Sequence, residues 1–482
     1  MRLKLLCKGL PVEIRGSKEM DITGLSADSK RVAPGNLFIA KKGRNFDGAL
    51  FIPEAVQNGA VAVLTDIYDP FLNNAVQILC NDLQAIEPVI AARFYHSPSD
   101  HLFLCGVTGT NGKTTTCYLI KHLFDYAGKN CGLMGTIETL IGNHSYFSEK
   151  TTADIVTNQK YLFEMVKEKC KTAVLEVTSH AIEQKRIEGL IFSLAVFTNF
   201  SQDHLDYHGT MDKYFEAKRK FFLSLTKKAK AIFNADEATS IKMMEGCQAI
   251  KLTYGIDSLA DLMAKDLSFS LQGTTFTLCY QQKEVSLSTK LVGKFNVYNI
   301  LAAILTALEY GISLAQITEA LPSFKGVPGR LQRVVNSCKK TVFVDFSHTP
   351  DALKQVLKTL RELQKGKIIT VFGCGGNRDA SKRPLMARVA EEASDFTVVT
   401  SDNPRKEDPE KICQEVALGF VKRDFIIEVD RYKAIEKAIA IAEKNDMVLI
   451  AGKGHEKTQI FAHRALPFDD VEVAKALLTK DV

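Results

Sequence analysis

A glycine-rich segment between a hydrophobic run and a helix-forming run offers the clearest chemistry in the sequence. Its residues are Gly109, Thr110, Asn111, Gly112, Lys113, Thr114 and Thr115. In a loop of this type, backbone N–H groups and the N-terminus of the following helix bind phosphate oxygens. The lysine neutralises the β and γ phosphates, and a threonine hydroxyl reaches magnesium. The common pattern has a further glycine where Val107 stands, so the sequence predicts a variant phosphate loop that binds ATP.

Polar residues that could hold a metal follow further hydrophobic runs. Glu176 ends one such run, and His204 lies in the polar segment after another. A carboxylate at the end of a buried strand is costly unless it is paired or metal-bound. Lys218 lies in a basic segment, 214–220. From the residues alone, Glu176 could be a strand-end surface charge. A histidine in a polar loop is more often a surface residue than a ligand, and the segment of Lys218 reads as a solvated basic helix face.

Hydrophobic runs with turn residues between them predict the elements that carry these groups. Strands are expected at 37–40, 61–64, 102–107, 173–177, 194–198, 341–346, 367–372, 396–400 and 447–451, and a helix at 113–126. Continuous apolar runs alternating with helical stretches are typical of parallel sheets buried on both faces. We therefore predict an α/β protein with a small α/β domain at 1–98, a central doubly wound parallel-sheet domain at 99–333, and a C-terminal Rossmann-like domain at 334–482.

Composition excludes several classes of protein. The chain has 482 residues with 46% hydrophobic and 24% charged residues, which is ordinary for a globular protein. Its net charge of +6 is spread along the chain, so no nucleic-acid partner is predicted. The cysteines are scattered without CxxC pairs, and no apolar run is long enough for a signal peptide or a membrane span. We expect a cytoplasmic protein without stable membrane insertion.

The phosphate loop resembles that of the Mur ligase family, whose members phosphorylate a carboxylate with ATP and let an amine attack the acyl phosphate. This resemblance implies ATP and Mg²⁺, with metal ligands at Thr114, Glu176, His204 and a carbamylated Lys218. It also implies that Asp345 joins Lys113, Glu176, His204 and Lys218 in catalysis. Asn296, Asn299 and Arg330 match the family's ATP-contacting positions. Three-residue spacing puts both asparagines on one helical face.

The resemblance extends over nearly the whole chain and assigns substrates to the outer domains. In the first domain, Ser29, Arg44, Asn45 and Phe46 match uridine-binding positions. In the central domain, Thr151, Thr152, Thr178, Gln184 and Arg186 match positions that hold the muramoyl dipeptide. In the third domain, Arg378, Asp402, Asn403, Pro404, Arg405, Gly452 and Glu456 are similar to the residues that bind diaminopimelate. The implied activity is ligation of meso-diaminopimelate to UDP-N-acetylmuramoyl-L-alanyl-D-glutamate in peptidoglycan synthesis, by a monomer that acts on small molecules.

Charge explains why this third domain favours diaminopimelate. The distal end of meso-diaminopimelate carries a carboxylate and an ammonium, whereas lysine carries only the ammonium. Arg405 with Arg378 would pair with the carboxylate, and Glu456 would accept from the ammonium. Bound lysine would leave a guanidinium of the site unpaired. A site of this kind can reject a substrate that lacks the polar partner by a factor of ~10⁴ or more.

Other functions remain open on the sequence. Folylpolyglutamate synthases share the phosphate loop but lack the extra N-terminal domain and the segment 402–405. A non-catalytic nucleotide-binding switch protein would need only the loop. The G-x-G-x-x-G pattern is absent, because Arg378 stands at its last position in the segment 373–378, which argues against a nicotinamide cofactor.

Overall fold

The computed structural model describes residues 1–43, 47–335, 340–363, 366–422 and 424–480. Contacts divide the chain into two compact units. The first comprises Met1–Gly106 and Lys129–Leu194, and the second comprises Val107–Gly128 and Ala195–Val482. Strands β6 (Phe103–Thr108) and β11 (Leu194–Phe197) each contain a boundary between the units. Within the described part of the chain, no helix has the length and hydropathy that a membrane span requires.

The first unit begins with a sheet of strand order β1-β5-β4-β3-β2, in which β2 to β5 are parallel and the edge strand β1 is antiparallel to β5. Its elements are α1 (Leu3–Leu6), β1 (Glu13–Arg15), β2 (Gly24–Ser26), β3 (Asn36–Ile39), α2 (Ile52–Gln57), β4 (Ala60–Thr65), β5 (Val76–Leu79) and α3 (Leu83–Phe94). The rest of the unit contains β7 (Cys131–Met134), β8 (Glu138–Ile141), β9 (His144–Phe147), α5 (Ile155–Lys167), β10 (Thr172–Glu176) and α6 (Ser179–Glu183). β10 pairs with β7 in parallel, and both strands are buried throughout. The hydrophobic run 173–177 predicted β10, whereas the sequence analysis did not predict β7.

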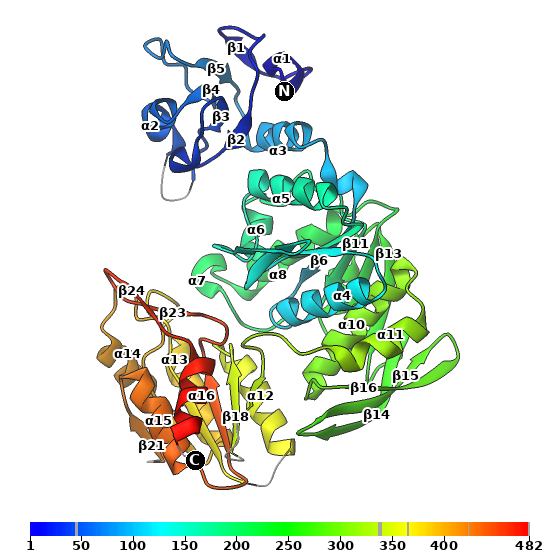
Figure 1. Ribbon diagram of the computed structural model, residues 1–482, viewed down its shortest axis with the longest axis vertical. Helices are drawn as coiled ribbons and strands as arrows, with labels where there is room; N and C mark the ends of the chain where they lie inside the picture. The colour runs from blue at the N-terminus through cyan, green and yellow to red at the C-terminus, as the bar shows by residue number, and fades with distance from the viewer. Residues whose placement is uncertain (44–46, 336–339, 364–365, 423, 481–482) are drawn as a thin grey trace. The chain divides into compact units, whose positions relative to one another are not determined.

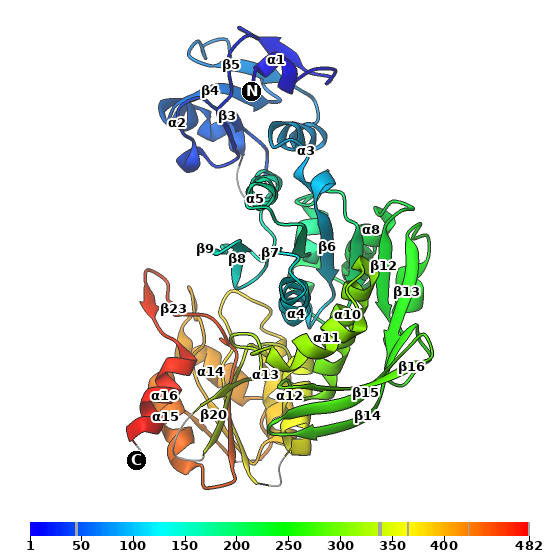
Figure 2. The same cartoon turned by 45° about the vertical axis from the view of Figure 1, so that its right-hand side comes forward.

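The second unit carries the phosphate loop and the elements that pack around it. They are α4 (Lys113–Tyr126), α7 (Leu205–His208), α8 (Met211–Leu223), β12 (Lys230–Asn234), α9 (Ser240–Met244), β13 (Ile250–Gly255), β14 (Leu262–Ser270), β15 (Gly273–Tyr280), β16 (Lys283–Thr289), α10 (Lys294–Tyr310) and α11 (Leu314–Ala320). β12, β13 and β14 are parallel neighbours, and β14, β15 and β16 form an antiparallel meander, visible as three long strands in Figure 2. The sequence analysis did not predict this meander.

The C-terminal part of the second unit is a sheet of strand order β17-β18-β22-β19-β20-β21. Its elements are β17 (Gln332–Val334), β18 (Thr341–Asp345), α12 (Pro350–Leu363), β19 (Ile368–Phe372), α13 (Lys382–Ala393), β20 (Phe396–Val399), α14 (Pro409–Ala417), β21 (Phe425–Ile427), α15 (Arg431–Ile441), β22 (Met447–Ala451), β23 (Thr458–Ile460), β24 (Ala465–Pro467) and α16 (Asp470–Lys480). All strands from β18 to β22 are parallel, and β17 is an antiparallel edge.

Two hydrophobic cores cover the two faces of this C-terminal sheet. One includes Leu353 of α12, Met386 of α13 and Ile412 of α14, and the other includes Ile435 of α15 and Leu477 of α16. Figure 1 shows α15 and α16 beside the strands they cover. Because the strands are parallel, their carboxyl ends meet at one edge, where ligands bind in open α/β sheets. The loops after β18, β19, β20 and β22 carry the predicted residues of this domain to that edge.

Candidate active site

The phosphate loop joins β6 to α4, and two of its glycines have no room for a side chain. Gly109 has φ 147°, and a Cβ atom there would lie 1.9 Å from Thr198 Oγ1. Gly112 has φ 83°, and its Cβ would lie 2.3 Å from Asn299 Oδ1. Backbone of this kind favours glycine, and the absence of side chains lets the loop pack directly on its neighbours. The loop therefore has the strand–turn–helix geometry that the sequence predicted.

Hydrogen bonds hold the loop against the segment that follows β11. The backbone N–H of Asn111 donates to Asn199 Oδ1 at 2.8 Å, and Thr198 Oγ1 donates to the Asn111 carbonyl at 2.7 Å. Lys113 Nζ donates to the carbonyl oxygens of Gly109 (3.0 Å) and Thr110 (2.8 Å). The lysine thus lies over its own loop, where phosphate oxygens would be its natural partners.

Lys218 is buried on α8 with its Nζ at the phosphate loop. It is 1% exposed, donates to the Gly109 carbonyl at 2.8 Å, and lies 4.6 Å from the centre of the Tyr214 ring. Burial and then the charge of Lys113 hold the pKa of Lys218 well below its ordinary value. A lowered pKa increases the share of the neutral amine, which is the form that reacts with CO₂. Lys218 is therefore not on the solvated helix face that the segment alone suggests. Its buried surroundings fit a carbamate.

His204 is the N-cap residue directly before α7, with φ 55°, and its Nε2 lies 3.4 Å from Asp203 Oδ2. Burial acts to raise the pKa of Asp203, but the charges of His204, His348 and Lys382 outweigh it, so the pKa is lowered. Lys382 Nζ also donates to the His348 carbonyl at 2.9 Å. Asp203 therefore interacts electrostatically with His204 and also with His348, which lies in the segment after β18.

Asn296 and Asn299, two of the predicted ATP-contacting residues, lie together on α10. Asn299 Nδ2 donates to Asn296 Oδ1 at 3.2 Å, and Asn296 Nδ2 donates to the Val292 carbonyl at 2.9 Å. Both side chains are buried, which confirms that the spacing places them on one helical face. The pair also adjoins the loop, because Thr116 Oγ1 lies 3.4 Å from Asn299 Oδ1.

Arg330 and Asp345 lie between the phosphate loop and the C-terminal sheet. Arg330 Nη2 donates to Thr114 Oγ1 at 3.1 Å, and its guanidinium carbon lies 4.5 Å from the centre of the Phe346 ring. Asp345 accepts from the backbone N–H groups of Leu331 (2.6 Å) and Ser347 (2.7 Å). Burial raises the pKa of Asp345 although Arg330 acts against it. The structure thus brings the predicted ATP-contacting residues of the second unit together.

In the first unit, Glu176 ends β10 and is fully buried. Its Oε1 accepts from the Thr136 N–H at 2.8 Å and its Oε2 accepts from Thr136 Oγ1 at 3.0 Å. Thr136 Oγ1 is also 3.1 Å from Thr151 Oγ1, and Thr152 Oγ1 donates to the Glu176 carbonyl at 2.6 Å. The carboxylate is therefore fixed by hydrogen bonds next to two residues predicted to hold the dipeptide.

The other predicted dipeptide residues adjoin this group. Thr178 caps α6, with Oγ1 accepting from the Ala181 N–H at 3.2 Å. Arg186 Nη1 donates to the Thr152 carbonyl at 2.9 Å, and its Nε donates to Gln184 Oε1 at 3.1 Å. These contacts leave the guanidinium beside the threonine pair, where it could bind a substrate carboxylate.

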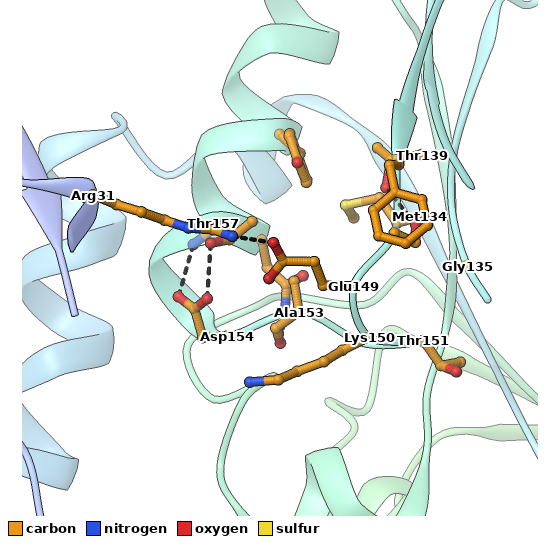
Figure 3. Close-up of a pocket in the computed structure, with 14 residues that line it drawn as sticks. Arg31, Met134, Gly135, Thr139, Glu149, Lys150, Thr151, Ala153, Asp154 and Thr157 are labelled. Carbon is orange, nitrogen blue, oxygen red and sulfur yellow. Dashed lines mark hydrogen bonds and ion pairs between the residues drawn. The ribbon is translucent and has the colours of Figure 1, made fainter. Parts of the chain in front are cut away.

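A pocket in the first unit lies beside this region and is also lined by Arg31 from the N-terminal part of the unit (Figure 3). Thr151, Lys150 and Gly135 line it, and Arg31 pairs with Glu149 across it. Ser29, predicted to bind uridine, is buried and donates from Oγ to Glu54 Oε2 at 2.6 Å. The other predicted uridine residues, Arg44, Asn45 and Phe46, lie outside the described residues.

The predicted diaminopimelate residues gather at the carboxyl edge of the C-terminal sheet. Arg405 and Arg378 flank Gly375, whose Cβ would lie 2.8 Å from Arg405 Nη1 and 3.9 Å from Arg378 Cγ. Burial, and then the charge of Arg378, lower the pKa of Arg405. Among the described residues, no carboxylate lies within ion-pair distance of either guanidinium. Two neighbouring guanidiniums without a carboxylate partner could together bind an anionic group.

The remaining residues of this group lie at the same edge of the sheet and contact one another or their neighbours there. Gly452 has φ 110°, and its Cβ would lie 2.6 Å from Asp402 Oδ2. Asn403 Nδ2 donates to Glu456 Oε2 at 2.7 Å. The Pro404 carbonyl packs on Gly376, where a Cβ would lie 2.0 Å from its oxygen. The loops after β19, β20 and β22 therefore contact one another at this edge.

The sequence analysis did not assign several residues that the structure places in these groups. They are Thr136, Asp203, His348 and Lys382. Asp203 is adjacent to His204, so its position in a polar loop after a strand was a usable signal. Thr136 and Lys382 gave none, because their importance depends on long-range contacts. Among the described residues, no group of three or more His, Cys, Asp or Glu side chains forms a metal site, and the predicted ligand set contains only two such side chains.

Three family models match the chain. The Mur ligase family catalytic domain matches residues 21–91, the Mur ligase middle domain matches 107–307, and the Mur ligase glutamate ligase domain matches 329–454. A UDP-N-acetylmuramoyl-L-alanyl-D-glutamate–2,6-diaminopimelate ligase of Chlamydia caviae is 44% identical over 100% of both chains. The chain belongs to the Mur ligase family. A relative of the same name from Caldanaerobacter subterraneus is 42% identical to this Mur ligase over 100% of the chain and 99% of its own length.

A solved structure supports the fold of this Mur ligase over its whole length. The structure of a UDP-N-acetylmuramoyl-L-alanyl-D-glutamate–2,6-diaminopimelate ligase has a TM-score of 0.70 and 34% identity, and it covers 100% of this chain and 99% of its own. The α/β fold predicted from the hydrophobic runs is therefore confirmed.

Proposed function

We propose that this Mur ligase joins meso-diaminopimelate to UDP-N-acetylmuramoyl-L-alanyl-D-glutamate, with conversion of ATP to ADP and phosphate, in peptidoglycan synthesis. The observation that carries this proposal is the Arg405–Arg378 pair, two neighbouring guanidiniums without a protein carboxylate among the described residues. The distal carboxylate of diaminopimelate would complete the pair. Full-length relatives with the corresponding name support the same substrate.

The reaction has two steps. The glutamate carboxylate of the dipeptide attacks the γ-phosphorus of ATP, the bond to the bridging oxygen breaks, and ADP leaves. The amine of diaminopimelate then attacks the resulting acyl phosphate, loses a proton, and expels phosphate as the amide forms. Positioning and charge stabilisation supply most of the catalysis in such transfers.

This chain's own residues have distinct tasks in that reaction. The loop 109–115 holds the triphosphate, Lys113 turns from its loop carbonyls to the phosphates, and Asn296 with Asn299 contacts the adenine. Arg330 and Asp345 orient the nucleotide from the C-terminal side. Thr151, Thr152, Thr178, Gln184 and Arg186 hold the dipeptide, and Ser29 with residues 44–46 binds uridine.

Magnesium would bridge the anionic reactants and reduce their repulsion. We propose Thr114, Glu176, His204 and the carbamate of Lys218 as its ligands. Oxygen ligands suit this ion, and a carbamate of Lys218 would supply one. The enzyme is proposed to work as a monomer in the cytoplasm, where ATP and UDP-linked precursors are available.

A substrate panel tests the proposal. Phosphate release is measured with ATP and the UDP-muramoyl dipeptide, and meso-diaminopimelate, lysine or ornithine is added in turn. We expect release to require the dipeptide and diaminopimelate together. Release stimulated by folate and glutamate would instead indicate a folylpolyglutamate synthase, and nucleotide binding without turnover on any panel would indicate a switch protein.

A further inference from the structure

Lys453 is a fully buried lysine in the loop after β22, with 0% of its surface exposed. Its Nζ has three acceptors at hydrogen-bond distance. They are Asn403 Oδ1 at 3.0 Å, Glu456 Oε2 at 3.2 Å and the Thr458 carbonyl at 2.7 Å. An ammonium has three protons, so each can be donated to one acceptor. A buried cation of this kind is costly unless it is fully paired, and here it is.

The partners of Lys453 include two side chains of the proposed amino-acid site. Asn403 Oδ1 also accepts from the Ile460 N–H at 3.0 Å, while its Nδ2 donates to Glu456 Oε2 at 2.7 Å. Lys453, Asn403 and Glu456 therefore form a closed triangle. Glu456 Oε2 receives two donors, whereas Oε1 has no hydrogen bond from the described residues. The triangle fixes the carboxylate through Oε2 and leaves Oε1 without a hydrogen-bond partner among the described residues.

We propose that Lys453 is a positioning and specificity-determining residue for the amino-acid substrate, a role that rests on the proposed function. It fixes Asn403 and Glu456 in their binding geometry. It also contributes a positive charge to the site. With Lys453, the site contains three cations, the other two being Arg378 and Arg405, and two carboxylates, Asp402 and Glu456.

This charge balance favours one class of amino acid. A side chain that ends in both a carboxylate and an ammonium brings no net charge to the site. A side chain that ends in an ammonium alone meets an excess of cations and only one free oxygen of Glu456. Lys453 therefore acts against lysine by partly neutralising the acceptor that a lone ammonium would need.

The test compares Lys453→Gln with Lys457→Gln. Glutamine keeps two N–H donors but removes the charge. Lys457 is four residues away, its side chain is 78% exposed, and it pairs with Asp469 at 3.0 Å, so it is a matched control for loss of a lysine from this loop. KM and kcat are measured for meso-diaminopimelate, lysine, ATP and the UDP-muramoyl dipeptide, together with the thermal melting temperature.

For Lys453→Gln, we expect the KM for meso-diaminopimelate to rise about tenfold or more, since a hydrogen bond to a charged group is lost. The KM values for ATP and dipeptide should stay within about twofold. The ratio of kcat/KM for diaminopimelate to that for lysine should fall by a similar factor, which a general loss of structure would not produce. Lys453→Arg should restore part of the discrimination, and Lys457→Gln should match the wild type.

A double variant separates direct from indirect action. If Lys453 works through Glu456, adding Lys453→Gln to Glu456→Gln should change the diaminopimelate KM by less than twofold, because the effects of coupled residues are not additive. Lys453→Met replaces Lys453→Gln if the latter is insoluble. Unchanged diaminopimelate KM and unchanged discrimination in a folded Lys453 variant would overturn the role. A wild-type enzyme that does not respond to diaminopimelate would instead overturn the proposed function.

Discussion

Lys218 Nζ donates a hydrogen bond to the carbonyl oxygen of Gly109 at 2.8 Å, and so joins a buried lysine on α8 to the loop that is proposed to hold ATP. Lys113 donates to the same carbonyl at 3.0 Å. Two lysines that share one acceptor repel each other if both are charged, which agrees with the lowered pKa of Lys218. Conversion of Lys218 to a carbamate would replace this repulsion by attraction and provide an oxygen ligand.

Replacement of Lys218 by Ala should abolish turnover, because the proposed magnesium ligand is removed. Millimolar acetate should restore part of the activity by occupying the vacated position. Phosphate release measured with and without acetate checks this expectation. Lys213→Ala, an exposed lysine on the same helix, is the control and should retain full activity. Full activity in Lys218→Ala would remove the carbamate from the mechanism.

Replacement of Gly109 or Gly112 by Ala should weaken ATP binding by about 10- to 100-fold, the cost of a lost hydrogen bond to a charged phosphate. The new Cβ would lie 1.9 Å from Thr198 Oγ1 or 2.3 Å from Asn299 Oδ1, so the loop must move. Gly128→Ala is the matched control, since Gly128 also has positive φ (72°) but no atom within 4 Å of its Cβ position. Calorimetric titration with ATP measures the difference. An ATP affinity of Gly109→Ala or Gly112→Ala equal to that of Gly128→Ala would contradict the need for a side-chain-free loop.

Patterns within single segments predicted the elements of the fold well. The helix predicted at 113–126 is α4, and the strand predicted at 447–451 is β22. Such elements are encoded locally, because a run of apolar residues between turn residues suits a strand buried on both faces. The meander from β14 to β16 lacked that signal. Its second turn contains Gln281 and Gln282 with φ 47° and 64°, where hairpins usually have Asn-Gly or Asp-Gly.

The candidate site could be predicted as a set of positions but not as a set of contacts. The resemblance to Mur ligases identified Glu176, Arg405 and Glu456 by number. It did not indicate that Thr136 donates a hydrogen bond to Glu176 or that Lys453 donates one to Glu456. Such hydrogen bonds join residues that are far apart in sequence or that belong to no motif of their own. Long-range packing decides which polar groups meet, and one sequence contains little information on it.

Replacement of Arg405 by Ala should raise the KM for meso-diaminopimelate by about 10- to 100-fold, the cost of one charge-assisted hydrogen bond, and leave the KM for ATP nearly unchanged. Arg405 Nη1 donates to the Gly376 carbonyl at 2.8 Å, which fixes the guanidinium beside Arg378. Lys406→Ala, an exposed neighbour, is the control for charge. Steady-state kinetics with each substrate varied in turn measures the effect. An unchanged diaminopimelate KM would move specificity to other residues.

Asp236 should make the stability of the second unit depend on pH in the acid range. Burial acts to raise its pKa, but hydrogen bonds from the turn 256–258 and from Tyr298 outweigh it and lower the pKa from 3.8 to about 2. Tyr298 OH, on the helix of the proposed adenine pair, donates to Asp236 Oδ2 at 2.9 Å. Because the folded-state pKa lies below the unfolded value, the stabilisation is complete above pH 4 and is lost as the pH falls toward 2. Because this group is partly exposed, solvent screening reduces its contribution to the free energy of unfolding to about 1 kcal/mol.

Thermal unfolding of the wild type and Asp236→Asn, at pH 6 and at pH 3, tests this dependence. The wild type should be the more stable at pH 6, and the difference should shrink at pH 3, because the carboxylate begins to take up a proton on unfolding there. Asp266→Asn, at an exposed position in β14, should show no such change in its difference from the wild type. A difference between wild type and Asp236→Asn that stays constant with pH would mean that the turn is held by hydrogen-bond geometry alone, to which the charge of Asp236 adds nothing.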